Sequence, residues 1–363
     1  MSMESPLLLD TLIAWSSSHL ALQDQTYELV ATANRCVALR SLSTALSSSK
    51  SEPEIGLAAC LIHCAMESIT GDTKQWFGHL VGAYEMIRSV AAVAGTTSLD
   101  LSAFSSTVEG RWLLSNFAYH DIMMTVTEDR KPLIIGGEYW NFLEDQDHPD
   151  AADTYFGLAS EIIYLISEIS ILNVDMLNSQ QALSSHNTIG THATTIQPSD
   201  PFSTTAHNLQ RTLQTWTPPT SQSYTLLALA NSYRSAALIH LYRTVRRHRP
   251  HLTPAVTPQI STQVSEIIAQ IRCIPPGCLA ESSLLLPLFM AGGEANNPEQ
   301  IAFLRGRMRS IAEERQFRNV ERCLAVLEEV WHFKLLETKA DGLNGMIDWK
   351  DVLRRRGWIL SIT

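Results

Sequence analysis

The chain has 363 residues, of which 45% are hydrophobic, so it is long enough to bury a large core. Its formal net charge of −10 argues against broad, unassisted binding to nucleic acid, which requires neutralisation of phosphate groups. The sequence contains no apolar run near the roughly 20 residues of a membrane span. The N-terminus lacks the basic segment of a signal peptide, so we expect a protein that stays inside the cell and contacts no membrane.

The first part of the chain has apolar residues three or four positions apart, the spacing of amphipathic helices. This spacing predicts helices over 7–20, 26–46, 54–69 and 72–93. In the first of them we expect four residues to point inward: Leu8, Leu9, Leu12 and Ile13. Successive helices with short turns predict an all-α fold, an irregular multi-helix bundle or solenoid of antiparallel helix pairs.

The middle of the chain continues this pattern with one interruption. Helices are predicted over 101–127, 151–178, 221–249 and 258–273. Between them, residues 178–205 are rich in Ser, Thr, Asn, Gln and His and carry two prolines. This composition predicts a long and flexible loop.

The last part predicts a compact unit of three helices. An apolar run from Leu284 to Ala291 is expected to break at Gly292 and Gly293. Asn297 and Pro298 then mark the start of a second helix, because a proline in the first turn needs no N–H. A third helix ends near Trp331, and a final one is predicted over 346–356.

Motifs of common enzymes are missing from the sequence. It contains no G-x-S-x-G elbow, H-E-x-x-H helix, G-x-G-x-x-G fingerprint or P-loop, so we expect no cofactor. Cys60, His63 and Cys64 lie within about one helical turn, but zinc would need a fourth ligand from elsewhere. Two buried thiols and a hydrogen-bonded histidine are the alternative, and we expect no metal.

Polar and aromatic residues suggest where a site could lie. His79, His120 and Glu294 are candidate catalytic residues that could polarise a carbonyl group. Five residues are candidates for lining a ligand pocket: Trp76, Tyr119, Trp140, Phe289 and Met290. For His79 the alternative is a core histidine that holds one helix to another, and for Trp140 it is packing of a loop onto the helical body.

The densest basic run is YRTVRRHRPH, from Tyr242 to His251. It could contact phosphate or serve as a nuclear localisation patch. It also ends a predicted helix, where cations are favoured by the helix dipole, so a solvated helix end is the alternative.

Five segments, in this order, resemble parts of the fungal-specific transcription factor domain: SPLLLDTLIAWSSSHLA at 5–21, WFGHLVGAYEMI at 76–87, FAYHDIMMTVTEDRKPLI at 117–134, LPLFMAGGEA with a later LEEVW at 286–331, and WKDVLRRRGWIL at 349–360. The resemblance covers nearly the whole chain and implies a single helical domain over 1–363. That family carries a zinc binuclear cluster that reads DNA. The six cysteines here are scattered and form no C-x-x-C pair, so that cluster is absent from this sequence.

Three functions remain open at this stage. The resemblance implies a nuclear regulatory or effector domain that senses a small molecule or contacts a partner, often as a homodimer, without direct sequence-specific DNA binding. The missing cluster raises a second hypothesis, a cytoplasmic, cofactor-independent enzyme or carrier for an apolar secondary metabolite, which would hold one reactive conformer in an interhelical pocket. The third hypothesis is a helical scaffold that binds another protein through an exposed apolar patch.

Overall fold

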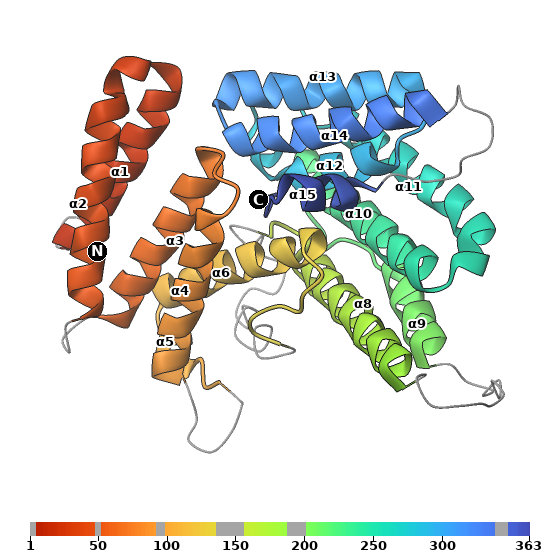
Figure 1. The fold of residues 1–363 in the computed structure, drawn as a ribbon, viewed down its shortest axis with the longest axis horizontal. Coiled ribbons are helices and arrows are strands. Elements are labelled where there is room, and N and C mark those ends of the chain that lie inside the picture. The colour runs from red at the N-terminus through yellow and green to blue at the C-terminus, as the bar shows by residue number, and fades with distance from the viewer. Residues whose placement is uncertain (1–4, 48–51, 92–98, 136–155, 187–200, 338–347) are drawn as a thin grey trace.

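The computed structural model describes residues 5–47, 52–91, 99–135, 156–186, 201–337 and 348–363 (Figure 1). The described residues form helices joined by turns, with no strand longer than a single bridged residue, which confirms the all-α prediction. The α-helices are α1 Pro6–Gln23, α2 Glu28–Leu46, α3 Pro53–Ile69, α4 Gln75–Ala91, α5 Ser102–Ser105, α6 Val108–Thr127, α8 Ser160–His186, α9 Pro201–Thr215, α10 Tyr224–His248, α11 Thr253–Arg272, α12 Leu285–Glu294, α13 Pro298–Arg315, α14 Arg318–Glu337 and α15 Trp349–Arg356.

Local signals set several helix ends. Ser5 and Asn297 cap α1 and α13 through their side chains, and each is followed by a proline in the first turn. Asp348 and Asp351 form a capping box at the start of α15. Gln316 adopts a left-handed conformation, with φ of 56°, and ends α13. These signals explain why the predicted helix start at Pro298 is confirmed.

Neighbouring helices in the chain pack as pairs (Figure 1). The α1–α2 hairpin, the red helices, stands at one edge of the molecule beside α3. The α13–α14 pair covers another side, and α8 to α11 form the end opposite the hairpin. The antiparallel run of α1 and α2 is fixed by two side-chain hydrogen bonds, Ser41 to Asp10 at 2.6 Å and Asn34 to Ser17 at 3.1 Å.

One hydrophobic cluster extends through α3 to α15. The α1–α2 hairpin reaches it only at one end, through Leu7, Leu8, Leu42 and the partly buried Ala45. Along its middle, the hairpin meets α3 in a separate small cluster of Ala14, Ala38 and Met66, with Trp15 packed against it. The hairpin is therefore joined to the body by a much smaller core than the other helices share.

The segment after α15 lies inside the molecule. The backbone N–H of Ile359 donates to the Thr73 carbonyl at 2.8 Å, and the Ile359 carbonyl accepts from the Trp76 indole at 2.9 Å. The Thr127 hydroxyl donates to the Leu360 carbonyl at 3.2 Å, and the side chain of Ile362 is 1% exposed. Residues 358–363 thus fill the space between α4, α6 and their neighbours.

Helix ends in the middle of the chain differ from the sequence prediction. The predicted loop over 178–205 is wrong at both ends, because α8 continues to His186 and α9 begins at Pro201; residues 187–200 lie outside the described residues. The start of α8 is Ser160 rather than 151. The polar composition of this segment does not predict α9, because the polar residues of the helix accompany a buried stripe of four apolar ones: Phe202, Ala206, Leu209 and Leu213.

The predicted break at Gly292 and Gly293 is also wrong, because α12 runs through both to Glu294. These glycines allow close helix packing instead. A Cβ atom on Gly292 would lie 2.5 Å from Cδ1 of Leu327, and one on Gly293 would lie 2.7 Å from Cδ1 of Trp349. Similarly, α11 starts at Thr253 and contains Pro258, which was predicted to begin it.

Candidate functional site

His79, a candidate catalytic residue, is half-buried on α4 and stacks on His63 of α3, with ring centroids 5.0 Å apart. His63 is fully buried, and neither ring nitrogen has a hydrogen-bond partner among the described residues. Burial, with the nearby His79 and Arg35, lowers the pKa of His63 to about 4. Burial and Arg35 also lower the pKa of His79. This uncharged pair joins α3 to α4, and the hydrogen bond of the alternative for His63 is absent among the described residues.

His120 and Tyr119 are both buried on α6. Burial lowers the pKa of His120 to about 4, so its ring is neutral near pH 7. The Tyr119 hydroxyl lies 3.0 Å from that of Tyr233, which donates to the Ser283 carbonyl at 2.9 Å. These contacts connect α6, α10 and the segment before α12.

Glu294 is buried at the end of α12 between two arginines of α10. Arg243 pairs with it, and Arg246 binds both carboxylate oxygens at 2.7 and 3.0 Å. Burial alone raises the pKa of a carboxyl group, but these arginines outweigh it and hold the pKa of Glu294 below its usual value. A carboxylate held in this way stays ionised and serves as an anchor between helices.

The basic run at Tyr242–His251 is largely used inside the fold. Arg243 also binds both oxygens of Asp348 at 2.7 Å, and Arg247 binds Asp129 at 2.7 Å. Arg249 lies over the ring of Phe202 at 4.8 Å. The alternative of a solvated helix end is therefore wrong for Arg243 and Arg246, because both are largely buried in ion pairs with Glu294 of α12 and, for Arg243, with Asp348 at the start of α15.

The described residues of the candidate ligand-binding set are buried in separate contacts. Trp76 donates to the Ile359 carbonyl, and Phe289 packs edge-on against Trp349 with centroids 5.1 Å apart. Met290 is 1% exposed, and Trp140 lies outside the described residues. The fourth described member, Tyr119, lies against Tyr233. The candidate ligand-binding set remains a prediction, and so do the candidate catalytic residues His79, His120 and Glu294.

Cysteines and acidic residues give no sign of a metal centre in the part of the chain that the structure describes. There, no group of three or more His, Cys, Asp or Glu side chains is placed to hold a metal ion. Cys60 and Cys64 are buried free thiols, and burial raises the pKa of Cys60 to about 11. They behave as small apolar core residues.

In the α1–α2 hairpin, α1 buries mainly small side chains and exposes large apolar ones, the reverse of a usual amphipathic helix. The residues that α1 buries are mostly small along its middle and end: Thr11, Ala14, Ser18 and Ala21. Its exposed side instead carries Leu9, Ile13 and Leu20, which are 44%, 45% and 39% exposed. The helix is therefore apolar on both sides, the pattern of a helix that is covered all round.

The neighbouring edge of α2 extends this exposed side. Asn34 and Ser41 face α1, since both bond to its side chains. Val30 and Val37 share that edge at helical spacing and are 52% and 43% exposed. We call the combined surface the outer face; its residues are Leu9, Leu12, Ile13, Ser16, Leu20, Val30, Ala33 and Val37.

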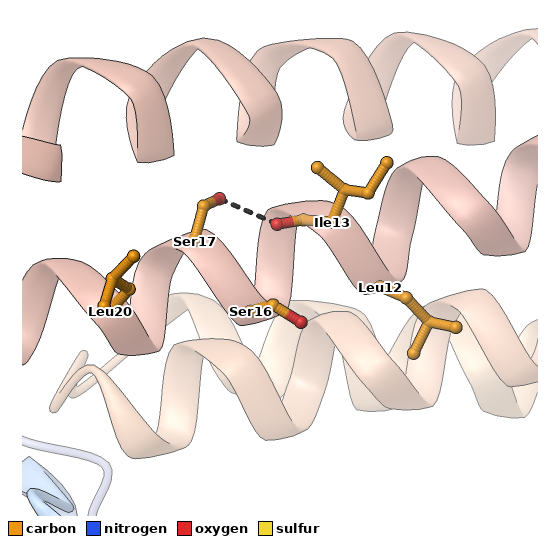
Figure 2. A pocket seen from close by; sticks show the side chains of 5 residues that line it. All are labelled: Leu12, Ile13, Ser16, Ser17 and Leu20. Carbon is orange, nitrogen blue, oxygen red and sulfur yellow. Dashed lines mark hydrogen bonds between the residues drawn. The ribbon is translucent and has the colours of Figure 1, made fainter.

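A shallow groove of about 350 Å³ lies along α1 in this outer face (Figure 2). It is lined by Leu12, Ile13, Ser16, Ser17 and Leu20. The Ser17 hydroxyl donates back to the Ile13 carbonyl at 2.7 Å, so its proton is used within the helix. An uncharged apolar surface of this kind can bind another apolar surface.

Sequence reasoning placed Leu9 and Ile13 inward, and the structure shows that this was wrong, because both are exposed. A helix with leucine and isoleucine on several sides offers no apolar stripe to choose. The useful signal was the stripe of small residues at positions 11, 14, 18 and 21, whose spacing marks the side that packs closely.

The described residues thus form a helical domain that exposes an apolar surface, the outer face, to solvent. The chain belongs to the family described as the fungal specific transcription factor domain, which matches residues 1–363. Membership supports a regulatory role in transcription. No curated protein and no solved structure matches the chain. Among the described helices, none combines the length and the apolar character needed to cross a membrane.

Proposed function

We propose that this chain is a nuclear regulatory domain that controls transcription by contact with other protein chains. The observation that carries this proposal is the family match over residues 1–363. The outer face of α1 and α2 supports the protein-contact part, because exposed apolar surfaces of this kind mark interaction sites.

Electrostatics favours protein contact over direct DNA binding. The chain has a formal net charge of −10. Arg243 and Arg246, two arginines of its densest basic run, are paired with the carboxylates of Glu294 and Asp348. If these two arginines were to bind phosphate groups, they would first have to give up these ion pairs.

A tethering experiment tests the proposal. An unrelated DNA-binding domain is fused ahead of Met1, since residues 358–363 are packed inside the fold. Recruited to a reporter promoter in a fungal cell, the fusion should change transcription several-fold relative to the DNA-binding domain alone. A reporter without the binding sites is the control. A folded, nuclear and promoter-bound fusion that leaves transcription unchanged would overturn the proposal.

A further inference from the structure

The outer face shows several properties of an interface whose other half is missing. Its large side chains point away from the body, while the side that packs on α3 carries mainly small ones. Leu9, Ile13 and Val37 are each more than 40% exposed on neighbouring helices. We infer that this face is covered by the same face of a second copy of the chain, so that two α1–α2 hairpins form a four-helix bundle. This inference rests on the proposed function and identifies its protein contact.

Charge argues for a second copy as the occupant. An interface between identical chains related by a two-fold axis must be complementary to itself. The outer face meets this condition because none of its residues is charged. Residues 6–46 hold three acidic and two basic residues, whereas the whole chain has a net charge of −10. Two acidic chains therefore meet with least repulsion through this hairpin.

The size of the face also fits. The 18 residues of α1 make a helix about 27 Å long, and two adjacent helices are about 20 Å wide. The face thus offers roughly 500 Å² per copy, or roughly 1,000 Å² for the pair, which reaches the lower limit of a specific interface. The paired hairpins would also have the packing of an ordinary four-helix bundle, with short loops and apolar facing stripes.

Val37 and Leu39 provide a matched test within one helix. They are 43% and 41% exposed, but two positions along a helix turn the side chain by about 200°, so only Val37 belongs to the outer face. The full-length chain, Val37→Glu, Ile13→Glu and Leu39→Glu are compared by analytical ultracentrifugation at about 1–50 µM. Circular dichroism confirms that each variant is folded, since all three side chains are already exposed in the single chain.

The wild-type chain and Leu39→Glu should sediment with twice the 40.4 kDa mass of one chain. Val37→Glu and Ile13→Glu should raise the dimer Kd at least tenfold, because each would bury carboxylates in an apolar interface. A chain with Ile13→Glu and Val37→Glu, mixed with one carrying lysine at both positions, should restore pairing. A monomeric wild-type chain, or a Val37→Glu variant that pairs as tightly as Leu39→Glu, would overturn the inference.

These outcomes are separable from the proposed function. A monomeric chain that still changes transcription when tethered leaves the regulatory function standing and points to a different protein on the outer face. If the chain dimerises through the outer face but the tethered fusion leaves transcription unchanged, the four-helix bundle is supported and the proposed regulatory function fails.

Discussion

Arg243 and Glu294 form an ion pair in which both side chains are less than a tenth exposed, at 8% and 5%. Arg243 also binds Asp348, the residue that caps α15, so that one guanidinium group joins α10, α12 and the start of α15. Charges at this depth depend on their partners, because water cannot replace them. The stability of the fold should therefore depend strongly on the three charged groups of Arg243, Glu294 and Asp348.

Replacing Arg243 with methionine should destabilise the protein. The change leaves Asp348 without its bidentate partner and Glu294 with Arg246 as its remaining arginine partner. Removing one partner of a buried pair costs roughly 3 kcal/mol in free energy of unfolding. Urea unfolding at pH 7 measures it. The control is Arg354→Met, whose pair with Asp351 is exposed at 70% and 44% and should cost at most about 0.5 kcal/mol. Equal losses for the two variants would contradict the prediction.

His120 should make stability depend on pH. Burial lowers its pKa to about 4, below the value near 6.5 of an unfolded histidine, so the unfolded chain binds the proton more tightly. Stability should therefore fall as the pH is lowered from about 6.5 to about 4, and His120 should account for about 2 kcal/mol of the loss at pH 5.

The variant His120→Phe removes this titration. The difference in unfolding free energy between pH 7 and pH 5 should shrink by about 2 kcal/mol, whatever the substitution costs at either pH. His207→Phe changes an exposed histidine of α9 and serves as the control. Identical pH profiles for the wild-type chain and His120→Phe would show that His120 binds its proton equally in both states.

Replacement by alanine should have opposite effects on stability at two glycines, Gly293, where α12 packs closely against α15, and Gly306, on an open side of α13. Alanine at Gly293 would place its Cβ 2.7 Å from Trp349 and should cost about 1–3 kcal/mol through overpacking. Alanine at Gly306 of α13 would meet no atom within 4 Å and should stabilise the helix by up to about 1 kcal/mol. Thermal unfolding of both variants measures the contrast. A neutral Gly293→Ala would mean that α15 moves aside without penalty.

The helical class and most helix positions could be predicted from the sequence because apolar spacing and caps act locally. Asn297 with Pro298 set the start of α13, as the sequence predicts. The role of Gly292 could not be predicted in this way. Its value depends on Leu327, which approaches from another helix, and no local pattern reports that distance.

The candidate site was harder to predict than the fold. Leu9 and Ile13 were placed inward because a leucine in a helix usually points to the core of its own chain. Their exposure depends on where α3 lies, and that position follows from small residues such as Ala14. Glu294 was predicted from its residue type as a polar group near a pocket. Its actual neighbours, Arg243 and Arg246, come from a helix about fifty positions earlier.

The buried segment after α15 limits when the helices around it can complete their packing during translation. Trp76 and Thr127, made early, give their side-chain hydrogen bonds to carbonyls of Ile359 and Leu360, which are made more than 200 residues later. The packing of α4 and α6 therefore cannot be completed until Ile359 and Leu360 have been synthesised, and the apolar side chains that this segment covers stay exposed until then. Transiently exposed apolar surface of this kind favours aggregation of a partly made chain.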